Sequence, residues 1–597
     1  MPSIRRSESV AGLAGLGVFA TFAVVVVCIA LFMPNAGSTP AYVGAGHETP
    51  QRGGTFTFHH ESDVRGFDPH ISFDELSNMG IKLMFEGLLD YDVETLVLIP
   101  RIAEAVPEPT EEGRVFRFRL RRDVRFSDSV VFCRNPARAT SPCPGRSVLA
   151  EDVRWSMEHM LNRDTASPGV TFYEQIEGVE AFRDGEASHV SGIRVLDEHT
   201  VEFRLAHPDQ TFLFAMAMTF AYPVAREAYA HYGDQISRNP VGTGAFVLDE
   251  WEPGVQVQFV RNDNFFIAGE PYVDRMRFIL NLDRRAAVLR FMDGEIDHIH
   301  RQTVADYLML KSYPAWEPYR DEHAKVNIWG LAMNCEMEPF TNVHVRRAFA
   351  FALNRERWRR ARANRLVLTG QPIPRLLPGF DDDLPGQHRF DLRLAREEMR
   401  LAGLPDGIEE TLTITMGDGD VSRFYGELIQ EDLRQIGVTV DIRQLSFPIW
   451  LQQTGTRDTV LMHLGGWSMD YPDASNFLDI LFHSRSRHDT DSENKAFYSN
   501  PELDRILDAA RIEVDRELRL SMYRDASRLI VDDAPWGFVF SDQAMEMWQP
   551  YVRNYRPHAV WSNMFRDVWL DMPRQRVAYR EMPTRNVPAL TPFGRRW

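Results

Sequence analysis

The sequence predicts an α/β fold, and two observations carry that prediction. Apolar residues alternate at 412–416 and at 438–442, which predicts two strands, and an amphipathic segment at 421–436 predicts a helix between them. A helix that connects two neighbouring strands in this way makes them parallel. The chain of 597 residues is also too long for one hydrophobic core, so several lobes are expected.

Composition and charge narrow the classes of function. Hydrophobic residues make up 44% of the chain and charged residues 25%, which is typical of a folded globular protein. The net charge of −18 gives no electrostatic support for binding to nucleic acid. We therefore expect a folded protein with no nucleic-acid partner.

The N-terminal segment, residues 1–35, predicts export. Arg5 and Arg6 precede an apolar run at 11–33, the order found in export signals. The run is also long enough for the roughly 20 residues that cross a bilayer. No clear small-x-small cleavage site follows it, so a cleaved signal and a retained anchor both stay open. Residues 36–49, rich in Gly, Pro, Ser and Thr, are expected to be a linker.

The first half of the folded body shows mainly strands and hairpins. Alternation of apolar with polar residues predicts strands at 53–58, 114–126 and 200–205, and apolar periodicity predicts helices at 77–90 and 151–161. A turn at 239–246 leads into a hairpin whose second strand is 255–260. Gly242 and Gly244 do not form a nucleotide-binding loop, because no Gly-Lys-Ser/Thr follows them.

The second half is richer in helices. A long helix is predicted at 342–360, with Thr341 or Asn342 as its cap. Further helices are expected after Asn500-Pro501 and at 515–531, followed by an apolar strand at 536–540. An apolar run at 459–464 predicts the strand that follows the parallel pair. Residues 574–597 are unpatterned and are expected to be an extended tail.

The four cysteines suit an exported protein. Cys133 and Cys143 lie ten residues apart in a loop, where an exported chain could close a disulfide. Cys28 lies in the N-terminal apolar run, and Cys335 is expected to be a buried thiol. No CxxC or HxxxH pattern accompanies these residues, so they do not predict a zinc site.

Motifs of catalysis and metal binding are weak. The sequence has no G-x-S-x-G elbow, zinc-protease helix or kinase motif, so no catalytic residue is predicted. His59-His60-Glu61 and the segment 297–300, Asp-His-Ile-His, contain metal-ligating residue types. Neither segment has a partner cluster that the sequence identifies, which favours a surface or hinge role. We therefore predict no metal and no cofactor.

The segment 464–482, LGGWSMDYPDASNFLDILF, contains the strongest candidate for a ligand site. Asp470 lies between Trp467 and Tyr471, a few residues beyond a predicted strand. Ligands of open α/β sheets bind beyond the carboxyl ends of strands, so Asp470 is predicted to be a charged anchor. The alternative is a turn or helix-cap residue, a role that Asp473 or Ser475 could fill equally well.

A series of motifs resembles the extracellular solute-binding proteins of ABC importers, family 5, the group of the periplasmic dipeptide and oligopeptide receptors. They occur in the family's order and cover nearly everything from about 50 to 570, and they include RGGTFTF, GFDPHIS, MFEGLLDYD, AEDVRWSMEHML, NPVGTGAF, FMDGEID, PFTNVHVRRAFAFALNRE, EDLRQIGVTV, GGWSMDYPDASNFL and NPELDRILDAAR.

The resemblance implies a periplasmic-binding-protein-like bilobal clamp with an additional third lobe. The first lobe would consist of three separate segments, 50–85, 238–325 and 535–573. An extra lobe would occupy 86–237, and the third lobe 326–534, which contains the predicted parallel strands.

The resemblance also implies the site. In the peptide receptors an acidic residue of the matching loop binds the α-ammonium group of the peptide, and Asp470 occupies that position. The expected ligand-binding residues are Asp470 with Trp467, Ser468, Met469 and Tyr471 from the same loop, and Ser72, Phe73 and Asp74 after GFDPH. Arg375 in QPIPRLLPG is the candidate for the peptide carboxylate.

These features predict the substrate-binding component of an ABC importer, which captures short peptides and delivers them to the permease subunits. We expect a non-enzymatic monomer, either free in the periplasm or tethered to the inner membrane by its N-terminal segment. The alternative is a membrane-anchored sensor, or a receptor for a nickel complex, a sugar or an opine, on the same fold.

Overall fold

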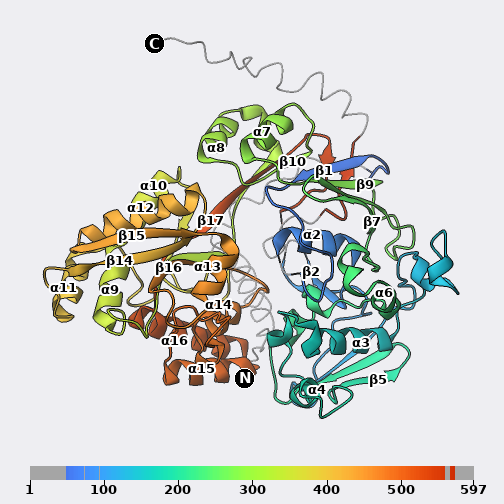
Figure 1. Cartoon of the computed structure of the whole chain (residues 1–597), viewed down its shortest axis with the longest axis horizontal. Coiled ribbons are helices and arrows are strands. Elements are labelled where there is room, and N and C mark those ends of the chain that lie inside the picture. The colour runs from blue at the N-terminus through green and yellow to red at the C-terminus, as the bar shows by residue number, and fades with distance from the viewer. Residues whose placement is uncertain (1–48, 73, 93–94, 558–564, 572–597) are drawn as a thin grey trace, which may run out of the picture. The chain divides into compact units, whose positions relative to one another are not determined.

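The computed structural model describes residues 49–72, 74–92, 95–557 and 565–571, which belong to one compact unit that begins at Thr49 (Figure 1). The predicted signal or anchor and the predicted tail lie outside the described residues, as does nearly all of the linker. Within the described ranges, no helix has the length and apolar character needed to span a membrane.

A four-stranded sheet contains the first strand of the body. Its order is β1 (Thr55–His59), β9 (Arg275–Ile279), β8 (Gln256–Arg261) and β7 (Phe246–Glu252), with β1 parallel to β9 and the other pairs antiparallel. Phe56 and Phe58 are fully buried in its core. Helix α2 (Glu75–Met84) packs against this core and ends earlier than the predicted 77–90, because the chain turns into β2 (Leu89–Tyr91).

A second, three-stranded sheet has the order β4-β6-β5. Its strands are β4 (Val115–Arg119), β6 (Thr200–Arg204) and β5 (Ile193–Asp197). The same part of the chain also forms β3 (Leu98–Pro100), which pairs with β2, and the helices α3 (Ala150–Leu161), α4 (Val179–Arg183), α5 (Phe212–Ala215) and α6 (Arg226–Tyr232). In β4, Phe116 and Phe118 are buried while Arg117 and Arg119 are exposed, which is the alternation that predicts this strand. Cys133 and Cys143 form a disulfide before α3.

The largest sheet is mixed. Its path is β10 (His298–Ile299), β17 (Trp536–Trp548), β12 (Asn327–Met333), β16 (Met462–Ser468), β14 (Ile408–Gly417) and β15 (Val438–Leu445), while β11 (Arg320–Ala324) and β13 (Leu366–Leu368) pair with β17. Strand β14 is parallel to both β15 and β16, so the predicted strand–helix–strand unit is confirmed, with α12 (Asp420–Arg434) as its helix.

Alternation along β12 divides the helices between two faces. Leu331 and Met333 join one buried cluster with α9 (Val343–Ala352), α11 (Leu392–Leu401) and α12, whereas Ala332 joins another with α14 (Ser475–Phe482), α15 (Pro501–Ile512) and α16 (Arg516–Asp533). Figure 1 shows these helices around the strands β14, β15 and β16. The remaining elements are α7 (Arg284–Met292), α8 (Val304–Lys311), α10 (Arg355–Ala361), α13 (Phe447–Thr454), β18 (Val552–Arg553) and β19 (Trp569–Leu570).

The predicted single helix at 342–360 is wrong, because the chain forms two helices there. Asn342 caps α9, and Asn354 then caps α10 by accepting a hydrogen bond from the Arg357 amide at 3.1 Å. An Asn side chain that bonds the backbone in this way favours a new helix start over continuation. The predicted strand at 536–540 is also too short, since β17 has 13 residues.

The buried side chains gather in separate clusters. One comes from residues 88–241 together with Tyr471, and another from 56–85, 222–280 and 548–570. Two further clusters lie within 326–540. The division into three lobes at the sequence-derived boundaries stays a prediction, since the described chain is compact throughout.

Candidate functional site

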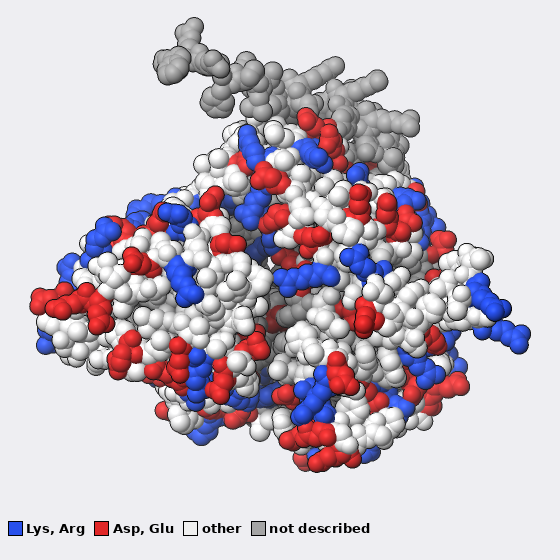
Figure 2. Space-filling model, viewed as in Figure 1, with Lys and Arg blue, Asp and Glu red and all other residues white. Residues whose placement is uncertain are grey.

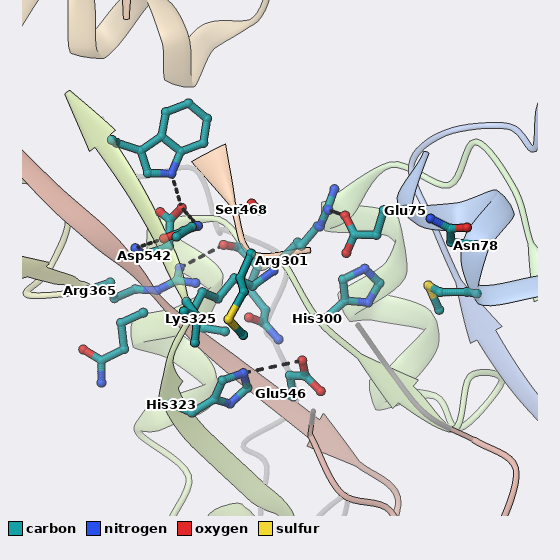
Figure 3. Close-up of a pocket in the computed structure, with 18 of the residues that line it drawn as sticks. Glu75, Asn78, His300, Arg301, His323, Lys325, Arg365, Ser468, Asp542 and Glu546 are labelled. Carbon is teal, nitrogen blue, oxygen red and sulfur yellow. Dashed lines mark hydrogen bonds and ion pairs between the residues drawn. The ribbon is translucent and has the colours of Figure 1, made fainter. Parts of the chain in front are cut away.

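A cavity of about 630 Å³ lies among α2, β12, β17 and the end of β16 (Figure 3). Its walls come from positions that are far apart in the sequence: residue 284 and residues within 75–82, 300–302, 323–329, 362–365, 468–470 and 542–546. A cavity of this size is typical of sites for small molecules.

Charges of both signs line the cavity. The basic residues are Lys82, Arg284, Arg301, Lys325, Arg362 and Arg365, and the acidic residues are Glu75, Asp470, Asp542 and Glu546. On the outer face shown in Figure 2, acidic and basic side chains are likewise interspersed. The lining suits a ligand that carries both a positive and a negative group.

Asp470 lies just beyond the carboxyl end of β16, and Asn476 of α14 holds it there. The Asp470 amide donates to Oδ1 of Asn476 at 2.9 Å, and Nδ2 of Asn476 donates to Oδ2 of Asp470 at 2.9 Å. Nε1 of Trp467 donates to the same Oδ1 at 3.1 Å. One fully buried amide side chain therefore fixes both ends of the segment 467–470.

The electrostatic setting of Asp470 leaves it without a counter-ion. Burial raises the pKa of its carboxyl to about 7, although the hydrogen bond from Asn476 opposes that rise. Among the described residues, no Lys, Arg or His lies within ion-pair distance of this carboxylate. A cationic ligand group at this wall would therefore stabilise the ionised form.

The other loop residues divide between the cavity and the core. Ser468 and Met469 line the cavity with Asp470, but Trp467 and Tyr471 do not. Tyr471 is buried against Phe214, with ring centroids 6.1 Å apart, and its hydroxyl bonds Ser475 at 3.2 Å.

Asp473, and not Asp470, has the role of the turn residue before α14. Its Oδ1 accepts a hydrogen bond from the Ser475 amide at 3.0 Å, at the start of α14. Asp473 also pairs with Arg519 at 2.8 Å and accepts a bond from the hydroxyl of Tyr523 at 3.0 Å. These contacts leave the carboxylate of Asp470 at the cavity wall.

On the opposite wall, the residues that line the cavity come after the predicted residues 72–74 in the chain. Asp74 caps α2 by accepting a bond from the Ser77 amide at 2.9 Å, and the Ser72 amide donates to the Asp68 carbonyl at 2.9 Å. Neither residue lines the cavity, and Phe73 lies outside the described residues. The lining comes from the following turns of α2, at Glu75, Asn78, Met79 and Lys82.

Arg375 lies away from the cavity. Its guanidinium pairs with Asp382 at 2.6 Å, lies 4.9 Å from the ring centroid of Phe380 and is half exposed. Arg362 and Arg365 line the cavity instead, and no carboxylate in the described chain pairs with either of them. They follow α10 and lie just beyond the helix that the sequence predicts at 342–360.

The two histidine-containing segments meet beside the cavity, and the burial of His60 and His300 contradicts the predicted surface position. His60 and Glu61 follow β1, His300 follows β10, and one ligand atom from each residue lies within 4.8 Å of the others. His60 and His300 are both buried. The sequence could not show this meeting, because β1 and β10 are neighbours only in the folded chain.

The family model of bacterial extracellular solute-binding proteins, family 5, matches residues 97–489, so the chain belongs to this family. Members of the family bind solutes rather than transform them, and the chain is a non-enzymatic solute-binding protein.

Similar proteins cover nearly the whole described chain. The di/tripeptide-binding protein 2 of Pseudomonas aeruginosa is 26% identical over 86% of this chain and 94% of its own length. The dipeptide-binding protein of Escherichia coli is 24% identical over 87% of this chain and 95% of its own length. The periplasmic binding protein DppA of Helicobacter pylori, solved with the peptide STSA, superimposes with a TM-score of 0.75 at 23% identity, covering 87% of this chain and 98% of that one.

Proposed function

We propose that this chain is the peptide-binding component of an ABC importer and that its ligand is a short peptide with a free amino terminus. One observation carries the proposal. Asp470 has no cation partner among the described residues, and it shares a cavity with Lys325, Arg362 and Arg365, which have no carboxylate partner among them. A zwitterionic peptide offers the complementary pair of charges in one molecule.

Asp470 is the anchor for the ammonium group in this proposal. A hydrogen bond to a charged group contributes about 1.5–3 kcal/mol net, and its strength rises where bulk water is excluded. Asn476 holds the carboxylate before a ligand arrives, so little conformational entropy is lost at this end of the ligand.

The peptide carboxylate is assigned to the basic group at Lys325, Arg362 and Arg365. Arg365 is held in place by a bond from its Nη1 to the Gln302 carbonyl at 2.9 Å, and its Nε has no partner among the described residues. Arg365 lies 4.6 Å from the ring centroid of Tyr307, which orients the guanidinium plane. Arg375, the candidate from the sequence, is replaced by this group.

The size of the cavity supports a short ligand. About 630 Å³ falls within the range for small-molecule sites and leaves no room for a folded partner. The Pseudomonas aeruginosa relative is named as a di/tripeptide-binding protein, which agrees with ligands of two or three residues.

We place the protein outside the cytoplasmic membrane, in the periplasm, as a monomer that meets the permease subunits of its importer. The apolar segment at 11–33 supports export, with either a cleaved signal or a retained tether. The periplasmic binding proteins among its structural neighbours support the same compartment.

Calorimetric titration with a library of di- to pentapeptides tests the proposal. We expect binding of free peptides, weaker binding of the same peptides after acetylation of the amine, and weaker binding after amidation of the carboxylate. Equal affinity for free and acetylated peptides would remove Asp470 from the amine-binding role. Binding of a sugar, an opine or a metal complex in place of any peptide would favour the alternative receptor classes.

A further inference from the structure

We propose that His60, Glu61 and His300 bind a first-row transition-metal ion such as Zn²⁺ at the wall of the cavity. One ligand atom from each of the three side chains lies within 4.8 Å of the others. The site goes beyond peptide binding, because none of these residues is needed for the charges at Asp470 or Arg365. His300 also lines the cavity, so a ligand there can approach the ion.

The backbone around the three residues is held by hydrogen bonds, so the site is built on ordered chain. The His60 amide donates to the Ile279 carbonyl at 2.9 Å, and the Leu282 amide donates to the His60 carbonyl at 3.1 Å. His300 follows β10, which pairs with the end of β17. Such support keeps side chains within the tolerance that metal coordination needs.

Three of the four ring nitrogens of these two histidines have no hydrogen-bond partner in the described part of the chain. His60 is 4% exposed and His300 is 5% exposed. Within the described ranges, Nε2 of His60 and both ring nitrogens of His300 are buried without a hydrogen-bond partner. A buried polar atom left unpaired destabilises a fold, and native structures contain few of them. A metal ion would supply the missing interactions.

Aromatic packing accounts for the contacts at the ring faces of His300, but it gives the ring nitrogens no partner. His300 stacks on Phe58 with ring centroids 5.0 Å apart and on His59 at 4.9 Å. Stacking occupies the ring faces, whereas the nitrogen lone pairs lie in the plane of the ring. His298 stands apart from this group, because its Nε2 contacts Glu546 at 3.2 Å. The nitrogen lone pairs of His300 are therefore not used by the stacking and could bind a metal ion.

Glu61 is oriented as a ligand by two arginines. Arg284 and Arg301 each donate to Oε1 of Glu61 at 2.9 Å, and Oε2 is buried with no hydrogen-bond partner in the chain that the structure describes. Arg301 also pairs with Glu75, so its charge is shared between two carboxylates. Outer-shell partners that fix the orientation of a ligand are a regular feature of metal sites.

The donor set identifies the class of ion. Imidazole nitrogens favour Zn²⁺, Ni²⁺ and Cu²⁺, whereas Mg²⁺ and Ca²⁺ favour oxygen ligands. Two histidines and one carboxylate leave at least one coordination position open. The Ser62 amide donates to Nδ1 of His60 at 3.1 Å. Binding through Nε2 moves the ring proton to Nδ1 and breaks this bond, so the ion also rearranges residues 60–62.

The experiment uses the full chain without a polyhistidine tag, purified in a mild detergent and treated with a chelator. Zn²⁺ binding is measured by calorimetry, and Co²⁺ is titrated as a probe whose visible absorption reports the ligand geometry. We expect one ion per chain, displacement of Co²⁺ by Zn²⁺, and no competition from Mg²⁺. In His300→Phe and in Glu61→Gln, Zn²⁺ should bind more than about 100-fold more weakly, since even outer-shell changes cost about 10–100-fold.

The matched control is His463→Phe, which removes another buried histidine with an unpaired Nε2, in β16. It should bind Zn²⁺ as the wild type does. His300→Phe should also keep or raise the melting temperature of the metal-free protein, because it removes unpaired nitrogens and preserves the stacking on Phe58. If His300→Phe does not fold, the Zn²⁺ affinity of Glu61→Gln tests the proposal in its place. No saturable Zn²⁺ or Co²⁺ binding in the wild type, or unchanged affinity in the site variants, overturns the proposal.

Discussion

Replacing Asp470 with Asn should weaken peptide binding and stabilise the ligand-free protein at the same time. The substitution keeps the shape of the side chain and an oxygen that can accept the bond from Nδ2 of Asn476. It removes the charge by replacing the other carboxylate oxygen with an NH2 group. The two opposite effects follow from one cause, because the charge that would attract an ammonium group has no counter-ion among the described residues of the ligand-free protein.

The size of the effect on stability follows from the raised pKa of the Asp470 carboxyl, and the size of the effect on affinity follows from the strength of one charge-assisted hydrogen bond. Its pKa rises from 3.8 to about 7, and each pKa unit corresponds to about 1.4 kcal/mol. Because the folded-state pKa is raised, the free energy of unfolding falls as the pH rises from 3.8 to about 7, by about 4 kcal/mol at most. Asp470→Asn removes this penalty above pH 7. Loss of a charge-assisted bond of about 1.5–3 kcal/mol corresponds to roughly 10- to 150-fold weaker binding.

Two assays on the same samples separate the effects. Calorimetry gives the affinity for a dipeptide, and thermal unfolding without ligand gives the stability at about pH 8 and about pH 5. The matched control is Asp473→Asn in the same loop, which should lower stability through the loss of Arg519 and Tyr523 and leave affinity nearly unchanged. An Asp470→Asn protein with wild-type affinity would refute the anchor role, and one with lower stability at pH 8 would refute the electrostatic reasoning.

Further predictions concern pH, the carboxylate end and the core contact of the loop. Peptide affinity measured by calorimetry should fall up to tenfold per pH unit below about 7, as Asp470 becomes protonated, and fall again above about pH 8, where the peptide amine loses its proton. Arg365→Met should weaken binding of free peptides by about tenfold or more and leave amidated peptides nearly unaffected; equal losses for both would contradict the assignment. Tyr471→Ala should lower the free energy of unfolding by about 3 kcal/mol, whereas Tyr471→Phe, which keeps the stacking on Phe214, should cost about 1 kcal/mol; chemical denaturation measures both.

Local patterns in the sequence predict much of the fold. The strand–helix–strand unit follows from alternation and from helical periodicity within a short segment, and β14, α12 and β15 occupy it. The position of Asp470 beyond the end of a parallel strand follows from the same reasoning. Those features depend on neighbours in the sequence, where periodicity carries the information.

Features that depend on distant contacts could not be predicted in this way. Alternation does not reveal that Tyr471 packs against Phe214, nor that Arg365 rather than Arg375 lines the cavity. The meeting of His60 with His300 likewise depends on contact between β1 and β10. No short-range signal distinguishes these pairs from the many others of the same residue types.

The long strand β17 has a consequence for the order in which the protein can fold. It lies between β10 and β12 in the mixed sheet, yet it begins only at Trp536, whereas β12 begins at Asn327. Residues 542–546 of the same strand line the cavity. Contacts between segments so far apart form late, because their loop-closure entropy must be overcome first. Neither the sheet nor the cavity can therefore be completed until nearly the whole of the described chain is available to fold.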